Sequence, residues 1–443
     1  MATPTLTNPI APPPQASEAG RQIYSLIEEL YPICRSITGD GFRQTLQRIS
    51  REIPLAIHEV PSGTQVFDWT VPKEWNIRDA YVKDARGERV IDFRRHNLHV
   101  VNYSTPVHRK MGLEELQQHL HSLPEQPGLI PYRTSYYQEN WGFCLAHRQR
   151  LQLKDEQYEV CIDSTLRDGN LTFGELLIPG SSSDEILVSC HACHPSLCND
   201  NLSGVSVATH LAKQLAGAQR RYSYRFLFIP GTIGSITWLF LNQSRVDRIR
   251  HGVVLTCVGD RGGFTYKKSR RGDAEIDRAF AHVLRHSGKL QAIQEFSPYG
   301  YDERQYCSPG FNLPVGCLMR TPHGKFPEYH TSGDNLELVN STSLGETYDA
   351  CRSVFRLLEE NRTYLNRNPK CEPQLGKRGL YGPIGGRDVK TSELAMLWVL
   401  NFSDGAHNLL DIAERSEMEF SLLADAARAL SSHGLLEEAQ RAS

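Results

Sequence analysis

The sequence predicts an α/β protein with a mixed, mainly parallel sheet and flanking helices, joined by a β-rich insert and a C-terminal winged-helix-like module. From about residue 158, short apolar strand-like runs alternate with helix-like runs, which is the rhythm of βαβ units. Residues 54–158 consist of short alternating runs and turn residues, a texture typical of β-structure. Three short helical patterns close the chain, and 443 residues are enough for two or three domains.

The N-terminal part divides into a leader and a helical segment. Residues 1–17 contain Pro12-Pro13-Pro14 and have no basic residue before Arg21. We therefore expect a disordered leader and no signal peptide. Residues 18–53 have helical periodicity and form the first part of the main domain. Their apolar positions are Ile23, Leu26, Ile27, Leu30 and Ile33.

The β-rich insert is expected at residues 54–158, with a short helix at about 112–123 inside it. The main domain resumes at 159–365. There, residues 186–190, 224–229 and 253–258 predict buried strands, and residues 204–215 and 236–241 predict helices between them. We expect the insert to cover the cleft of the main domain, because clefts between domains favour ligand sites.

Residues 366–386 are rich in Pro, Gly and basic residues and predict a linker. Residues 387–443 predict a winged-helix-like domain with helices at 391–400, 409–415 and 420–430. This module carries five basic and ten acidic residues, a net charge of −5. Phosphate contacts need several Lys or Arg on one face, so we expect no nucleic acid as a partner.

Composition indicates a globular protein. The net charge is −2, and no run of about 18 apolar residues is present, so we expect neither nucleic acid nor membrane as a partner. The eleven cysteines are scattered along the chain and no export signal precedes them, which favours reduced thiols in the cytoplasm. The sequence allows a homo-oligomer.

Residues 190–204 bring two imidazoles, three thiols and a carboxylate into one short segment between a predicted strand and a predicted helix. This placement is typical of a catalytic metal loop, with His191, His194 and Asp200 as candidate ligands and Ser203 as a candidate helix cap. Three other interpretations stay open. The Cys-x-x-Cys-His motif fits haem attachment, and the three thiols fit a structural zinc knuckle. Alternatively, the cysteines and histidines of this segment are buried core residues.

Three later segments carry further candidates. Asp260 follows a buried strand and is either a metal ligand or a turn former. His330 is a candidate ligand, and Asp334 is placed to orient its ring or loop. Asp302 and Glu303 are either solvated surface acids or catalytic residues. We expect the substrate to contact Arg304, Tyr329 and Asp334.

Read together, His191, Asp200 in Asp-Asn-Leu-Ser-Gly, Asp260, and His330 in Tyr-His-Thr-Ser-Gly-Asp-Asn resemble the zinc aminopeptidase clan, which includes glutaminyl cyclase. The similarity is greater to a branch of aminopeptidase-like proteins linked to surface-polysaccharide or secondary-metabolite genes. The shared text includes His-x-Cys-His-Pro-Ser, Pro-Gly-Thr-Ile-Gly-Ser, Cys-Val-Gly-Asp, Ile130-Pro131-Tyr132 and Trp141-Gly142-Phe143. The resemblance covers most of residues 20–430 and implies a zinc exopeptidase-like fold with these metal ligands.

The sequence also departs from this clan. The aminopeptidases have a Glu-Glu pair after the next strand, where this chain reads Pro230-Gly231-Thr232, and the orienting Asp of their His-x-Asp is Cys193 here. One zinc is therefore expected rather than two. Glu303 aligns with a segment that lines the family's active site, so it is the expected general base.

The expected function is zinc-dependent hydrolysis of an amide or peptide bond on a specialised peptide or small molecule in a biosynthetic pathway. Two alternatives stay open: a zinc-dependent acyl transfer or cyclisation enzyme, and a non-catalytic binding protein that has lost the catalytic Glu pair.

Overall fold

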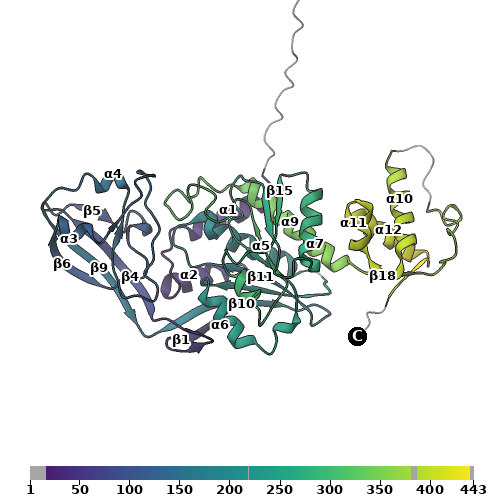
Figure 1. Ribbon diagram of the computed structural model, residues 1–443, viewed down its shortest axis with the longest axis horizontal. Helices are drawn as coiled ribbons and strands as arrows, with labels where there is room; N and C mark the ends of the chain where they lie inside the picture. The colour runs from purple at the N-terminus through teal and green to yellow at the C-terminus, as the bar shows by residue number, and fades with distance from the viewer. Residues whose placement is uncertain (1–15, 218, 381–386, 440–443) are drawn as a thin grey trace, which may run out of the picture.

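The computed structural model describes residues 16–217, 219–380 and 387–439. Apart from its last two residues, the expected leader 1–17 lies outside these ranges, as do residues 381–386 of the expected linker. The chain forms three bodies in a row, with the β-rich insert at one end, the α/β domain in the centre and the C-terminal helices at the other end (Figure 1).

The central body contains an eight-stranded mixed sheet in the order β1-β10-β12-β11-β13-β16-β14-β15. The strands β12, β11, β13 and β16 are parallel to one another. Strand β10 runs antiparallel to both of its neighbours, β1 and β12, and β14 runs antiparallel to β16 and parallel to β15. The bounds are β1 Ala56–Pro61, β10 Asn170–Ile178, β12 Ser223–Ile229, β11 Glu185–His191, β13 Ile249–Leu255, β16 Val315–Met319, β14 Phe264–Lys267 and β15 Gln291–Gln294. The expected mixed, mainly parallel sheet is therefore confirmed.

Every residue of β11 and β12 is buried, as expected for strands covered on both faces. Two of these buried residues carry opposite charges and pair with each other. Arg225 on β12 bonds Glu185 on the neighbouring β11 through Nε and Nη2, at 2.6 and 2.8 Å. This pairing explains how a cation is accommodated in an otherwise apolar strand.

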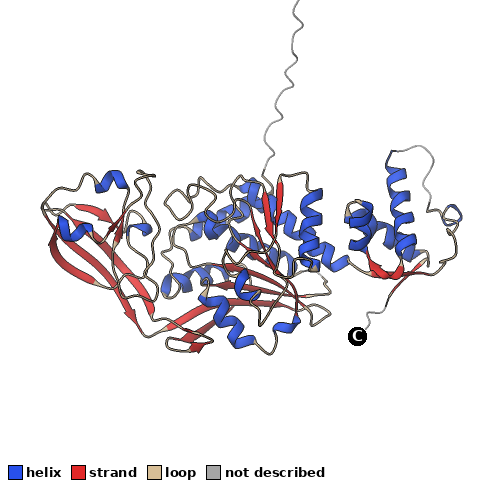
Figure 2. Cartoon of the chain, in the orientation of Figure 1, coloured by secondary structure: helices blue, strands red, loops and turns tan. Residues whose placement is uncertain are grey.

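Helices cover the sheet on both sides (Figure 2). Helices α1, α5, α7 and α9 form one connected group, and α6 packs against β10 and α8. The helical segment 18–53 forms two helices, because Pro32 and Gly39 separate them. The bounds are α1 Glu18–Leu30, α2 Asp40–Ile49, α5 Ser203–Leu215, α6 Ile233–Asn242, α7 Glu275–His286, α8 Glu303–Tyr306 and α9 Ser341–Glu360, with a 3₁₀ turn at Val246–Arg248.

The insert is built on a four-stranded antiparallel sheet in the order β5-β4-β9-β6. The expected helix at 112–123 is shorter than predicted, because Leu120 leaves it to pair with Phe143. The bounds are β4 Glu74–Lys83, β5 Arg89–Asp92, β6 Val107–Gly112, β9 Gln157–Arg167, β2 Gln65–Val66, β3 Trp69–Thr70, β7 Leu120–His121, β8 Phe143–Cys144, α3 Leu113–Gln117 and α4 His147–Arg150, with a 3₁₀ turn at Asn97–His99. Strand β1, within the expected insert range 54–158, instead pairs with β10 in the central sheet.

The C-terminal body contains the three expected helices and a small sheet ordered β18-β17-β19. It packs on the central body through Arg278 of α7, which bonds Asp411 and Glu414 at 2.6 and 2.5 Å. The bounds are α10 Arg387–Phe402, α11 Leu409–Ser416, α12 Phe420–Ser432, β17 Thr363–Asn366, β18 Asp404–Asn408 and β19 Leu436–Glu438, after a 3₁₀ turn at Gly376–Arg378. Nowhere in the described ranges is a helix both long and apolar enough to span a bilayer.

Candidate metal centre

The candidate site lies where the carboxyl ends of β11, β13 and β16 meet. His191 is the last residue of β11, and Asp200 lies in an irregular turn, Cys198–Leu202, that precedes α5. His330 is in the loop after β16. Adjacent parallel strands end at the same edge of a sheet, so this topology gathers residues that are far apart in sequence.

Three histidines surround the carboxylate of Asp200, and we call His191, His194, Asp200 and His330 the histidine cluster. His191 Nε2 lies 2.9 Å from Asp200 Oδ1, and His330 Nε2 lies 3.0 Å from Oδ2. His194 Nε2 is 3.8 Å from the same Oδ2. Three possible ligand atoms, one each from His191, His194 and Asp200, lie within 4.8 Å of one another. This spacing fits one metal ion. The structure thus brings both His191 and His194 to Asp200.

The turn that carries Asp200 is fixed by its polar neighbours. Asn199 accepts from the backbone N–H of Gly259 at 2.8 Å, and Asn201 donates to the carbonyl of Leu255 at 2.9 Å. Both bonds tie the turn to the end of β13. Ser203 is not the expected helix cap, since its hydroxyl donates to the carbonyl of Asn199 and accepts from Val258 N–H.

Gly204 is required by the close approach of β13. A Cβ at this position would lie 2.3 Å from the carbonyl oxygen of Leu255. Any larger residue would push α5, and with it the Asp200 turn, away from the sheet. The small residues of the Asp-Asn-Leu-Ser-Gly text therefore place the carboxylate.

Asp334 holds the same turn from the opposite side. Its two carboxylate oxygens accept from the backbone N–H groups of Asn199 and Asp200, at 2.6 and 2.9 Å. Burial raises the pKa of Asp334 to about 8, against the lowering effect of these hydrogen bonds. Asp334 is fully buried, so its expected substrate contact does not fit the structure, whereas its orienting role on the loop does.

The charge states of the histidine cluster suit a metal. Burial alone raises the pKa of Asp200, but His194 and the hydrogen bonds from His191 and His330 outweigh it and hold the pKa well below its usual value. Burial lowers the pKa of His194 well below the ordinary value, although Asp200 opposes this. An ionised carboxylate beside a neutral imidazole is the state in which both bind metals.

Asp302 is fully buried at the start of α8. Ser235 Oγ donates to its Oδ1 at 2.8 Å, and burial raises its pKa to about 6, opposed chiefly by His191. Asp302 Oδ2 and His191 Nδ1 are both buried and without a hydrogen-bond partner among the described residues. Asp302 therefore acts on His191 through its charge and not through a hydrogen bond to the ring.

Glu303 does not occupy the position of a general base. It is fully buried, lies 2.5 Å from Lys267 Nζ and accepts from the backbone N–H of Tyr301. A general base must reach a proton on the substrate or a water, and this carboxylate faces a lysine instead. Arg304, on the same short helix α8, is exposed and does not line the cavity described below, so its expected substrate contact is also not supported.

Asp260 is likewise separated from the histidine cluster by its own hydrogen bonds. Its Oδ2 accepts from Asn199 Nδ2 at 2.9 Å, and its Oδ1 accepts from Thr321 Oγ1 at 2.8 Å and Gly262 N–H at 2.6 Å. It belongs to neither group of candidate ligands among the described residues. Asp260 therefore joins the loops after β13 and β16, and its expected role as a metal ligand does not fit this geometry.

The loop after β12 has no space for the acidic pair of the aminopeptidases. The ring of Tyr301 packs directly on Gly231, where a Cβ would lie 1.9 Å from a ring carbon. The same ring stands 4.0 Å from that of His191, measured between centroids. Tyr301 thus fills the volume that an acidic side chain on this loop would need.

A cavity of about 540 Å³ opens onto His330. Its walls come from the insert, including Glu125, Tyr132 and Arg133, and from the loop after β16, including Tyr329. The insert docks on this loop through backbone bonds, among them Tyr132 N–H to the carbonyl of His330 at 2.7 Å. The ring of Tyr329 stacks on that of His330 at 4.0 Å, so its expected substrate contact fits the cavity.

The sequence analysis missed two residues near Asp200 and one residue of the adjoining cavity. Cys257 and His323 lie close to Asp200 and are buried, and Glu125 lines the cavity. Cys257 sits in the shared Cys-Val-Gly-Asp text, so that motif pointed to the right loop although Asp260 was chosen from it. Nothing in the local sequence marks His323 or Glu125.

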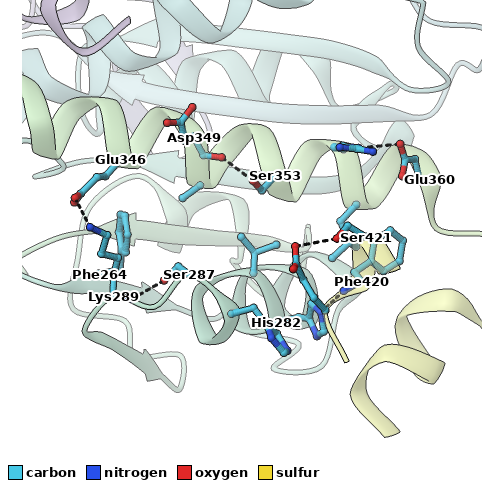
Figure 3. A pocket seen from close by; sticks show the side chains of 16 residues that line it. Phe264, His282, Ser287, Lys289, Glu346, Asp349, Ser353, Glu360, Phe420 and Ser421 are labelled. Atoms are coloured by element: carbon cyan, nitrogen blue, oxygen red, sulfur yellow. Dashed lines mark hydrogen bonds and ion pairs between the residues drawn. The ribbon is translucent and has the colours of Figure 1, made fainter. Parts of the chain in front are cut away.

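A separate cavity of about 360 Å³ lies between α7, α9 and the start of α12 (Figure 3). His282, Lys289, Glu346 and Phe420 are among its lining residues. None of the residues that line it belongs to the histidine cluster, so we do not assign it to the candidate metal centre.

Comparison with known proteins agrees with this architecture. Residues 24–361 match a family described as "Domain of unknown function (DUF4910)", and residues 362–438 match a winged helix-turn-helix family. A Clostridium acetobutylicum protein, named as a candidate polysaccharide biosynthesis protein with an aminopeptidase-like domain, is 56% identical over 94% of this chain and 96% of its own.

Solved structures give the same result for the fold. A crystal structure of a candidate peptidase from Clostridium acetobutylicum has a TM-score of 0.92 and 55% identity, covering 95% of this chain and 97% of that chain. A zinc aminopeptidase from Bacillus subtilis has a TM-score of 0.54 at 11% identity, covering 77% and 95%, and shares the fold. The chain therefore belongs to the DUF4910 family, as an aminopeptidase-like protein with a C-terminal winged-helix domain.

Proposed function

We propose that this protein is a zinc-dependent hydrolase of an amide bond in a peptide or an N-acyl small molecule. The observation that carries the proposal is the histidine cluster, in which three imidazoles surround one buried carboxylate at the end of the sheet. Imidazole and carboxylate are ligands that zinc accepts, and the carboxyl edge of an α/β sheet is where such sites occur.

Asp200, His191, His194 and His330 would hold the metal. His330 faces the cavity, with its side chain 35% exposed, whereas the side chains of the other three are at most 4% exposed. A bound zinc supplies Lewis acidity to an amide carbonyl and to a water. Asp302 would act on His191 through its charge, since no hydrogen bond joins the two side chains in the described chain.

The insert would supply the proton acceptor. Among the residues that line the cavity, Glu125 is the carboxylate, and it is exposed. It would take a proton from water and return it to the leaving amine, the role that Glu303 cannot fill from its buried position. Tyr329 and Arg133 would contact the substrate, since both line the same cavity.

The substrate belongs to a narrower class than the general aminopeptidase substrates. The insert covers one wall of the cavity, and the acidic pair of the aminopeptidases is absent from the loop after β12. The name of the Clostridium acetobutylicum relative supports including N-acyl amino sugars with dipeptides and N-acyl amino acids in a substrate panel. Aminoacyl-arylamides should be turned over weakly or not at all.

The test combines metal content with product analysis by mass spectrometry on this panel. Asp200→Ala should abolish zinc binding and turnover. Glu125→Gln should keep zinc and lose about 10²–10⁴ in rate. Asp260→Asn is the matched control and should keep zinc. Full zinc occupancy in Asp200→Ala would disprove the proposal, and transfer products without free acid would redirect it to acyl transfer.

A further inference from the structure

A second group of candidate metal ligands also includes Asp200. Asp200, Cys257 and His323, which we call the thiol cluster, each offer one ligand atom, and these atoms all lie within 4.8 Å of one another. All three residues are buried, at 1%, 0% and 7% exposure. Cys257 follows β13 and His323 follows β16, so the neighbouring strand ends bring them together.

The backbone around Cys257 is held in place on both sides. Its own φ is 51°, in the left-handed region that a non-glycine residue adopts at a cost. The N–H of Thr256 bonds the carbonyl of Leu318, and the carbonyl of Cys257 accepts from Arg320 N–H at 2.8 Å. These bonds to the end of β16 hold the left-handed conformation that places the thiol beside Asp200 and His323.

His323 is oriented by a neighbouring hydroxyl. Its Nε2 lies 3.2 Å from Thr256 Oγ1. Hydrogen bonds of this kind fix the ring orientation of ligating histidines. Thr256 therefore helps to position both residues: its backbone bond holds the segment next to Cys257, and its hydroxyl orients the ring of His323.

Other buried cysteines in the described chain have different surroundings. Cys190 Sγ is directed at a backbone carbonyl, that of Leu227, and Cys351 lies in the apolar core on α9. Cys257 is instead grouped with a carboxylate and an imidazole.

Asp200 belongs to both groups of candidate ligands, one with His191 and His194 and the other with Cys257 and His323. A carboxylate shared by two ligand groups can bridge two cations. We propose that Cys257 and His323 bind a second metal ion together with Asp200, one that accepts thiolate and imidazole ligands, as zinc does. The inference rests on the proposed metal centre in that the two ions would share Asp200.

This second position changes the expectation drawn from the sequence. The missing acidic pair after β12 led to an expectation of one zinc, because one ligand of the second ion was absent. The thiol cluster offers a different ligand set for that ion, from the loops after β13 and β16. The prediction is therefore two metal ions per chain, one of them bound through sulfur.

The test loads the metal-depleted full-length protein with Co²⁺ and reads both the metal content and the absorption. A thiolate ligand gives a charge-transfer band in the near ultraviolet that imidazole and carboxylate ligands do not give. The wild-type protein should bind two equivalents and show the band. Cys257→Ser should bind one equivalent without the band, and His323→Ala should also lose one equivalent.

Controls separate this inference from the proposed function. Cys351→Ser, another buried cysteine, should behave as the wild type. The double variant His191→Ala with His194→Ala should lose one metal equivalent and keep the band. A Cys257→Ser variant that loses the band but keeps one bound equivalent would leave the proposed metal site at the histidine cluster intact. One equivalent without a band in the folded wild type would overturn the inference. So would a band that disappears in Cys193→Ser instead of Cys257→Ser, because Cys193 Sγ lies 3.3 Å from His194.

Discussion

The buried pair between Lys267 and Glu303 gives the sharpest prediction about stability. Glu303 is fully buried and the side chain of Lys267 is 5% exposed, with 2.5 Å between Nζ and Oε1. Glu303→Gln keeps the shape of the side chain and removes its charge. Breaking a buried ion pair from one side costs about 3–5 kcal/mol. Lys267 keeps its hydrogen bonds to the carbonyls of Ser297 and Tyr299 in this variant. We therefore expect a loss of stability at the lower end of this range, about 3 kcal/mol.

The expected change in midpoint follows from the size of the chain. An unfolding entropy of about 2.1 cal/mol/K per residue over 443 residues converts 3 kcal/mol into a decrease of about 3 °C in Tm. Differential scanning calorimetry at neutral pH measures it. The matched control is Glu295→Gln, which breaks the pair with Lys268 at 2.7 Å, where the glutamate is 76% exposed. That exposed pair is worth about 0–1 kcal/mol, so Tm should hardly change.

The same variant decides between a structural and a catalytic role for Glu303. In the structural interpretation, folded Glu303→Gln retains its metal and its turnover of whichever panel substrate is cleaved. The reasoning would be refuted by an unchanged Tm together with a rate loss of about 10²–10⁴ at full metal content, because that pattern belongs to a general base. Lys267→Met combined with Glu303→Gln should recover part of the lost stability, since no buried charge is left unpaired.

Two further predictions concern the C-terminal domain. At about 150 mM salt, fluorescence anisotropy of the full chain with duplex DNA should show no micromolar binding, because residues 387–443 carry net charge −5; a micromolar Kd would contradict this. The second concerns His282, whose Nε2 accepts the Phe420 N–H at 3.1 Å and whose pKa burial lowers to about 4. Below about pH 6.5 the unfolded chain binds a proton that the folded chain does not, so stability falls by about 2 kcal/mol between pH 7 and about pH 5. Calorimetry at the two pH values should show a smaller decrease in the free energy of unfolding for His282→Gln than for the wild type. The control is His286→Gln, a change at an exposed histidine. Equal decreases in the wild type and His282→Gln would refute the prediction.

The sequence by itself determined the architecture, because hydrophobic periodicity is a local property. The buried strands β11, β12 and β13 and the three C-terminal helices were recognisable as runs of apolar residues with the right spacing. The motif text also identified the loops after β11, β13 and β16 that carry the site. His191, His194, Asp200 and His330 are all brought together there.

Only the tertiary structure decided which polar side chains at those strand ends face the common centre. Asp260 and Cys257 are three residues apart on one loop, and the backbone conformation after β13 places the thiol, not the carboxylate, beside Asp200. Glu303 was assigned by alignment to a segment, but on helix α8 its charge is paired with Lys267 of strand β14. Glu125 and His323 reach the site from segments with no local signal, because the docking of the insert and the sheet order, not periodicity, bring them there.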